Sequence, residues 1–201
     1  MASTQPNDLA ILEAGHAIFG YLIDVLMEIW HVTIDNDFSR QINPLSDGGI
    51  FFRYIKNPDN LHHFDRDQFC LSNLSGLAAD IVNEYDGKIP EGFFDSATFL
   101  SKLSLSYYIG DLKSFNAFFQ GLQSRLMYLP FTYNQTSIKL LTNIFSNEKI
   151  LPVLLSIREV IDKQKTIERK DLYELLDKSY LSEFKKSSWL NVKEVRKKLF
   201  F

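Results

Sequence analysis

The chain has 201 residues, of which 45% are hydrophobic and 23% are charged, and its net charge is -3. This apolar content is enough for a substantial core and argues against an intrinsically disordered chain. The near-neutral charge balance gives no indication of nucleic-acid binding, which would need a broad basic face. Cys70 is the only cysteine, which excludes an intramolecular disulfide and a cysteine-based zinc site.

The N-terminal half predicts two helices and two strands. Residues 9–27 are apolar on almost every face, which is typical of a helix surrounded by protein. The β-branched and aromatic residues at 29–34 and 50–55 predict two strands, and turn-forming residues at 43–49 predict a loop between them. Apolar residues at helical spacing then predict a second helix over 65–85.

Beyond residue 93 the predicted segments are all helical, at 94–108, 111–128, 135–146, 148–164, 169–178 and 190–199. The sequence therefore predicts a mostly α protein of the α+β class, with a small two- or three-stranded sheet near the N-terminal helix. We expect a single domain over residues 1–201. In it, residues 1–92 hold the first helix, the sheet and the second helix, and residues 93–201 form a helical subdomain.

The sequence gives no signal for secretion or membrane insertion. Residues 1–8 are polar and lack the basic start of a secretory signal. Residues 9–30 are apolar, but Glu13, His16, Asp24 and Glu28 interrupt them, whereas a membrane span needs about 20 mostly uncharged residues. We therefore expect a cytoplasmic protein with no transmembrane segment.

Charge is unevenly distributed along the chain. Residues 1–100 carry 15 acidic and 5 basic side chains, and residues 101–201 carry 10 acidic and 17 basic ones. One interpretation is that two parts of the molecule attract each other. The other is head-to-tail self-assembly into a homo-oligomer, or docking to a charged partner. The basic run at 185–198 is interleaved with apolar residues, so it predicts an amphipathic end helix that docks on the body or contacts a partner or a membrane surface.

The segment Glu13-Ala14-Gly15-His16-Ala17 begins an ordered series of motifs. It is followed by Val32-Thr33-Ile34, Gly76-Leu77-Ala78-Ala79-Asp80 and Ala97-Thr98. Over most of residues 9–178 this series resembles the peptidase domain of the FtsH-type, membrane-tethered AAA zinc proteases. In that family a His-Glu-x-x-His helix supplies two zinc ligands and a general base. An aspartate four residues before an Ala-Thr pair supplies the third ligand.

The site residues depart from the family pattern. Leu12 stands where the first histidine ligand should be, and a leucine has no lone pair to donate. Glu13 keeps the position of the general base, and His16 that of the second histidine. Counting back from the Ala-Thr pair without gaps places Phe93 at the aspartate position, with Asp95 two residues farther on. Hydrolytic zinc needs three protein ligands and a water, so we expect no cofactor, a vestigial general base in Glu13, and vestigial or weak metal ligands in His16 and Asp95.

Other titratable residues give weaker signals. We expect His31 to be a strand side chain and Cys70 to lie in the core. His62 and His63 fall in a predicted loop and could bind adventitious metal, but adjacent residues rarely place both rings on one ion.

Together these features predict a catalytically inactive FtsH-type peptidase-like domain that acts as a peptide- or partner-binding or regulatory module. The partner could be an ATPase-protease. Two alternatives stay open: an active zinc metallopeptidase that recruits a replacement ligand, and a structural subunit of an oligomer. Metal content separates the first two, because only the metallopeptidase needs stoichiometric zinc.

Overall fold

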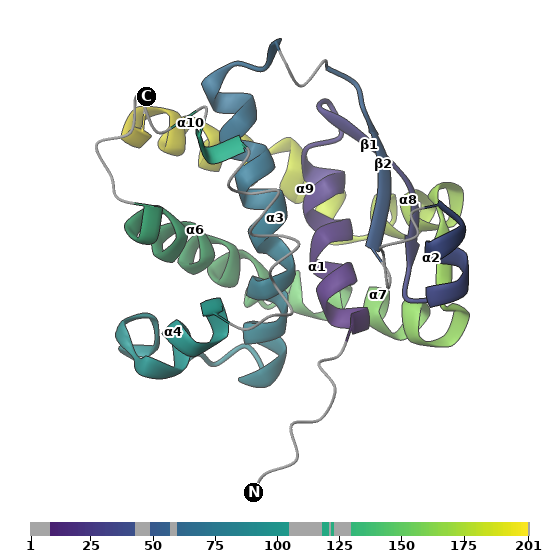
Figure 1. Ribbon diagram of the computed structural model, residues 1–201, viewed down its shortest axis with the longest axis horizontal. Coiled ribbons are helices and arrows are strands. Elements are labelled where there is room, and N and C mark those ends of the chain that lie inside the picture. The colour runs from purple at the N-terminus through teal and green to yellow at the C-terminus, as the bar shows by residue number, and fades with distance from the viewer. Residues whose placement is uncertain are drawn as a thin grey trace, which may run out of the picture.

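Two long helices form the centre of the molecule. The structure, a computed structural model, describes residues 9–42, 49–56, 60–104, 118–120, 122 and 130–200. In it α1 (Leu9–Leu22) and α3 (His63–Glu84) lie side by side (Figure 1). All of α1 is buried except Leu9, Glu13 and His16, which confirms the buried first helix. It ends earlier than residue 27, however, because a turn over 23–26 leads directly into the first strand.

A small antiparallel sheet packs beside α1. Its strands are β1 (Met27–Thr33), β2 (Gly49–Tyr54) and β3 (Thr166–Glu168), in the order β2-β1-β3. The register of β1 and β2 shifts between Ile29 and His31, so Trp30 is a bulge residue. The first two strands were predicted. The prediction allowed for a third strand but did not locate it, since three residues are too few for a period-two pattern to be recognised.

The other helices carry local signals that explain where they begin. Asp35 caps the short helix α2 (Asn36–Ile42), with its Oδ1 accepting from the backbone N–H groups of Asp37 and Phe38. Ser179 caps α9 (Tyr180–Lys186) in the same way through Leu181 N. Neither α2 nor α9 was predicted, because seven residues give little helical periodicity.

The remaining elements follow the predicted helical half of the chain. They are the 3-10 turn η2 (Phe93–Asp95), α4 (Ala97–Ser104), α6 (Pro130–Phe145), α7 (Leu151–Gln164), α8 (Arg169–Asp177) and α10 (Ser188–Phe200). Most of the predicted helix over 111–128 and of the predicted loop over 43–49 lies outside the described residues. The mostly α fold with a small antiparallel sheet is confirmed.

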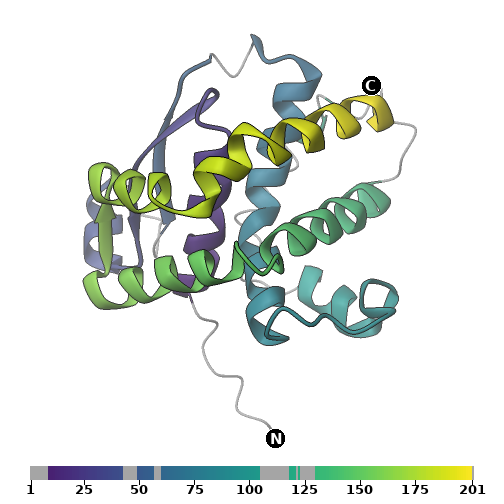
Figure 2. The same ribbon diagram turned by 180° about the vertical axis from the view of Figure 1, so that it is seen from behind.

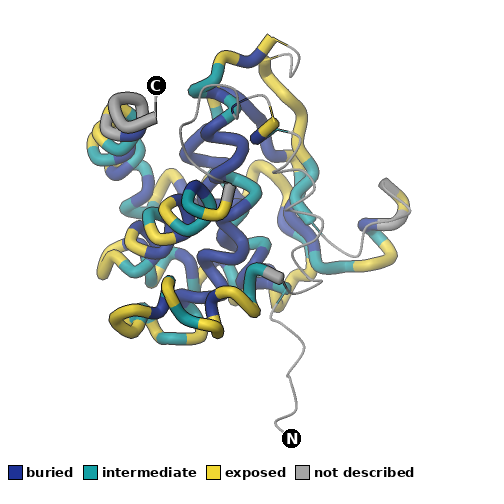
Figure 3. Tube along the Cα trace, turned by 60° about the vertical axis from the view of Figure 1, so that its left-hand side comes forward, coloured by how far each residue is buried: buried dark blue, intermediate teal, exposed yellow. Residues whose placement is uncertain are grey.

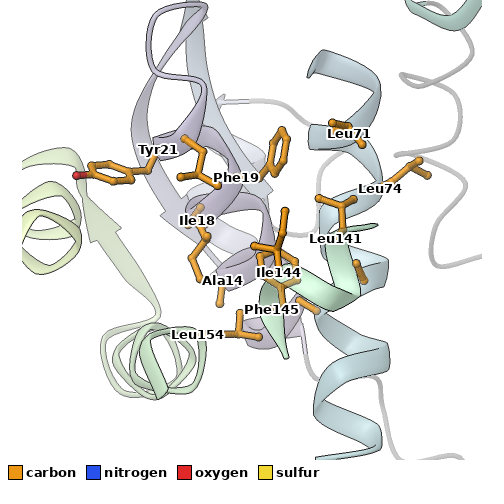
Figure 4. Packing of buried hydrophobic residues seen from close by; sticks show 14 of the residues in the cluster. Ala14, Ile18, Phe19, Tyr21, Leu71, Leu74, Leu141, Ile144, Phe145 and Leu154 are labelled. Carbon is orange, nitrogen blue, oxygen red and sulfur yellow. The ribbon is translucent and has the colours of Figure 1, made fainter. Parts of the chain in front are cut away.

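The core lies where α1, α3, α6 and α7 meet. Apolar side chains from all four helices converge there (Figure 4). The buried positions run along α1 and α3 at the centre of the molecule (Figure 3). Seen from behind, α9 crosses α1 and α10 crosses α3, whereas α8 packs on β1 and β3 of the sheet (Figure 2). Within the described ranges, no helix combines the length and the apolarity needed to cross a bilayer.

Ion pairs join the acidic N-terminal part of the chain to the basic C-terminal part. They link Asp24 with Lys185 at 2.5 Å, Asp67 with Arg196 at 2.6 Å, Asp80 with Lys102 at 3.0 Å, and Glu28 with Arg169. These contacts support the first interpretation of the charge asymmetry, attraction between two parts of one molecule.

Candidate functional site at the crossing of two helices

Two residues of the peptidase-like motif, Gly15 and His16, lie on the face of α1 that meets α3. Positions four residues apart share one face of a helix, so Leu12 and His16 lie one above the other. Leu12 is only 6% exposed and belongs to the apolar core. The leucine side chain therefore occupies the position that the first histidine ligand would take.

His16 is held against α3 by hydrogen bonds. Its Nδ1 lies 2.8 Å from the carbonyl oxygen of Ser72 and 3.1 Å from the hydroxyl oxygen of Ser75. A carbonyl can only accept, so Nδ1 carries a proton and donates it to Ser72. In the neutral ring Nε2 is then the nitrogen with the lone pair. Zinc-ligating histidines commonly donate one ring N–H to a carbonyl oxygen, as His16 does. Among the ligand positions of the motif, only His16 keeps the geometry of a ligand.

Gly76 makes room for the imidazole. A Cβ atom at this position would lie 2.5 Å from Nε2 of His16 and 3.0 Å from both Cδ2 and Cε1. The two carbons lie only 0.5 Å farther from this position than Nε2 does, which is less than an in-plane approach along the lone pair allows, so the face of the ring lies over the glycine. Gly15, one position earlier on α1, packs as closely, since its Cβ would lie 2.6 Å from the backbone oxygen of Ser75. The two glycines therefore set the close approach of α1 and α3.

Glu13 is partly buried and lies three residues before His16, on the adjoining part of the helix surface. Its carboxylate oxygen Oε2 is buried. The candidate general base and the candidate ligand thus lie near each other on α1, as the motif requires.

The residues near the Ala-Thr pair face other surroundings. Phe93 is 4% exposed and packs in an aromatic cluster with Tyr85, Phe94 and Phe99. Asp95 is exposed, and its Oδ1 accepts a hydrogen bond from Gln135 Nε2 at 2.9 Å. The structure thus ties Asp95 to α6.

This arrangement can be tested against the needs of a zinc ion. His16 offers one nitrogen donor, Leu12 offers none, and Asp95 already accepts from Gln135. In the part of the chain that the structure describes, no three His, Cys, Asp or Glu side chains are grouped so that they could hold a metal. The described residues therefore do not fit a three-ligand hydrolytic zinc site.

The other candidate residues have structural surroundings. His31 lies in β1, as predicted, with its ring 5.4 Å from that of Phe38. His62 lies outside α3 as its extended N-cap residue, whereas His63 is the first residue of the helix rather than part of a loop. Cys70 is fully buried, as predicted, and burial raises the pKa of its thiol well above the ordinary value, so it is not a poised nucleophile.

A buried ion pair was missed by the sequence analysis. Arg196 is 4% exposed and donates from Nε and an Nη nitrogen to both carboxylate oxygens of Asp67, at 2.8 and 2.6 Å. Tyr133 donates its hydroxyl to the same carboxylate at 2.5 Å. Burial alone would lower the pKa of Arg196, but Asp67 outweighs it and raises that pKa. The sequence pattern that could have identified this arginine as buried is the spacing of Trp189, Val192 and Arg196. It places the arginine on the apolar face of α10.

No protein-family model matches the chain, and neither does any curated protein. The resemblance to the FtsH-type peptidase domain therefore depends on the order of the motifs in the sequence alone.

Proposed function

We propose that this chain is a catalytically inactive, FtsH-type peptidase-like domain that binds a peptide or a partner protein. The observation that carries the proposal is the buried Leu12, four residues before His16. It puts an apolar side chain at the position where the family's chemistry needs its first metal ligand.

The remaining motif residues have a packing role that needs no metal. Gly15 and Gly76 allow α1 and α3 to touch, and the His16 ring fills the space over Gly76 while its Nδ1 donates to Ser72. Glu13 could act as a general base only if a metal lowered the pKa of a bound water. This crossing is best explained as a structural joint between two core helices.

A binding role is supported by apolar side chains on the surface. Val25, Trp30, Ile55 and Leu190 are each about half exposed, at 59%, 47%, 54% and 53%. Val25 and Leu190 line the same groove, and exposed apolar side chains that lie together are typical of contacts with other proteins. The partner class that we propose is a peptide or a protein, such as an ATPase-protease, rather than a nucleic acid.

Metal analysis of the purified chain, combined with a proteolysis assay on a fluorescent unfolded protein, tests the proposal. We expect zinc far below one ion per chain and no hydrolysis that a chelator removes. One zinc per chain, together with hydrolysis lost in Glu13→Gln and His16→Ala but kept in Lys178→Gln, would establish the alternative, an active metallopeptidase. Light scattering on the same sample tests the second alternative, an oligomer subunit.

A further inference from the structure

A groove of about 370 Å³ lies between the turn that follows α1 and the helices α9 and α10. Figure 2 shows α9 crossing α1 and α10 continuing from it across α3. Tyr21 lies at the edge of the apolar cluster, and its ring extends from α1 away from the other labelled side chains (Figure 4). Three lysines, Lys185, Lys186 and Lys193, line the groove together with Asp24 and Asp177.

Both carboxylates in the groove already have partners. Asp24 pairs with Lys185 at 2.5 Å, and Asp177 accepts a hydrogen bond from the Tyr21 hydroxyl at 2.7 Å. Lys186 and Lys193 make no ion pair with any described residue. The Tyr21 hydroxyl is neutral, so Asp177 keeps its charge, and three lysines against two carboxylates give the groove a net charge of +1.

Lys193 is partly buried, with its Nζ 5.7 Å from the centre of the Trp189 ring. Burial, followed by repulsion from Lys185, lowers the pKa of Lys193, and the attraction of Asp24 and Asp65 only partly offsets these effects. An anion in the groove would relieve this repulsion and compensate the desolvated ammonium.

Trp189 lines the groove beside Lys193. It is 1% exposed and packs edge-on against Phe19 at 5.2 Å. The indole Nε1 is buried, and no acceptor for it exists within the described part of the chain. A ligand that shifts the side chains around this ring would change the surroundings of the indole, which makes Trp189 a reporter of binding in the groove.

The rim of the groove is apolar. Val25 and Leu190 line it, and both are more than half exposed. A ligand that complements the groove thus combines a negative charge with an adjacent apolar group.

We propose that this groove binds an acidic peptide segment of a partner, with a carboxylate at Lys186 and Lys193 and an apolar side chain on Val25 and Leu190. The inference rests on the proposed binding role and gives it a place and a partner chemistry. It does not depend on the metal content of the α1–α3 crossing. A failure of one proposal is therefore distinguishable from a failure of the other.

Fluorescence of Trp189 tests this inference. Trp30→Phe makes Trp189 the only tryptophan, and the probe is a capped heptapeptide of alternating leucine and glutamate. We expect a saturable change in emission, and binding about tenfold weaker for the same peptide with glutamine in place of glutamate. Added salt should weaken the binding of the glutamate peptide only.

Lysine variants locate the binding. Lys186→Gln with Lys193→Gln should weaken the glutamate peptide about tenfold, whereas Lys163→Gln with Lys170→Gln, which removes the same charge elsewhere, should leave it unchanged. Leu190→Ser should weaken it without changing any charge. Three results would each overturn the proposal. The first is equal affinity for the two peptides, and the second is an equal effect of the two lysine pairs. The third is lysine-dependent binding to phosphatidylserine vesicles with no binding to the peptide.

Discussion

The α1–α3 crossing and the α9–α10 groove use their polar side chains in opposite ways. At the crossing, the His16 ring is bonded to Ser72 and lies flat on Gly76. In the groove, Lys193 has no ion pair and Trp189 has no acceptor among the described residues. The motif that resembles a catalytic site is thus a closed contact between two helices, while the polar groups without a partner among the described residues belong to a C-terminal segment without a motif. The family resemblance and the unpaired polar groups therefore lie in different parts of the molecule.

The largest expected effect contrasts two neighbouring cations of α10, one buried and paired and one at the groove. Arg196→Met leaves Asp67 buried without its charged partner and should lower the free energy of unfolding by about 3–5 kcal/mol. Lys193→Met, at the groove, should change it by less than about 0.5 kcal/mol. Urea unfolding measures both. Similar losses in the two variants would show that Lys193 contributes as much to the stability of the fold as Arg196.

The closeness of the helix crossing gives the next effect. Gly76→Ala drives a methyl group into the imidazole of His16 and should cost about 1–3 kcal/mol of stability. His16→Ala in the same chain removes the clash, so the double variant should be more stable than Gly76→Ala alone. Thermal or urea unfolding of the three variants decides. A tolerated Gly76→Ala would mean that the ring does not lie on α3.

A third variant tests whether the α1–α3 crossing can be converted into a zinc-binding site. Leu12→His places a second imidazole on the same face as His16, so the variant should gain measurable zinc binding at some loss of stability. Phe93→Asp, which would restore the family's third ligand, is not added to this variant. It would bury a carboxylate among Tyr85, Phe94 and Phe99. Calorimetric zinc titration, with Lys178→His as the control for an added surface histidine, measures the gain. No gain in zinc binding would mean that side chains at positions 12 and 16 cannot reach the same ion.

The smallest effect concerns pH on the groove side. Burial, and then the hydrogen bond to Asp177, raise the pKa of Tyr21 from 10.0 to about 12. Between these values the folded state holds a proton that the unfolded chain has lost, so stability falls as pH rises through this window. Tyr21→Phe should make the fall shallower, with Tyr180→Phe as the control. Unfolding measured between pH 9 and about 12 checks this, and identical slopes in both variants would contradict it.

The sequence predicted the central helices and the two longer strands because their patterns are local. All-round apolar residues in α1 and helical spacing in α3 are visible in single segments. The end of α1 at Leu22 was missed because the turn that follows it contains no glycine or proline. Three-residue β3 and seven-residue α9 are too short for their periods to show.

For the site, the sequence identified which residues differ from the family but not what each one touches. The loss of a ligand at Leu12 follows from residue type alone. The contact between His16 and Gly76, and the partner that Gln135 gives Asp95, depend on how distant helices cross. Arg196 was assigned to a basic run because its partner Asp67 lies far away along the chain.

The state of the His16 ring is the most direct test of the account. Nitrogen NMR of the four histidines, assigned with the His16→Ala variant, reports which ring nitrogen carries the proton and whether zinc binds the other. We expect a ring protonated at Nδ1 whose Nε2 signal does not change on addition of one equivalent of zinc. A zinc-dependent shift of Nε2 at one equivalent would show that His16 is a metal ligand and would contradict the account.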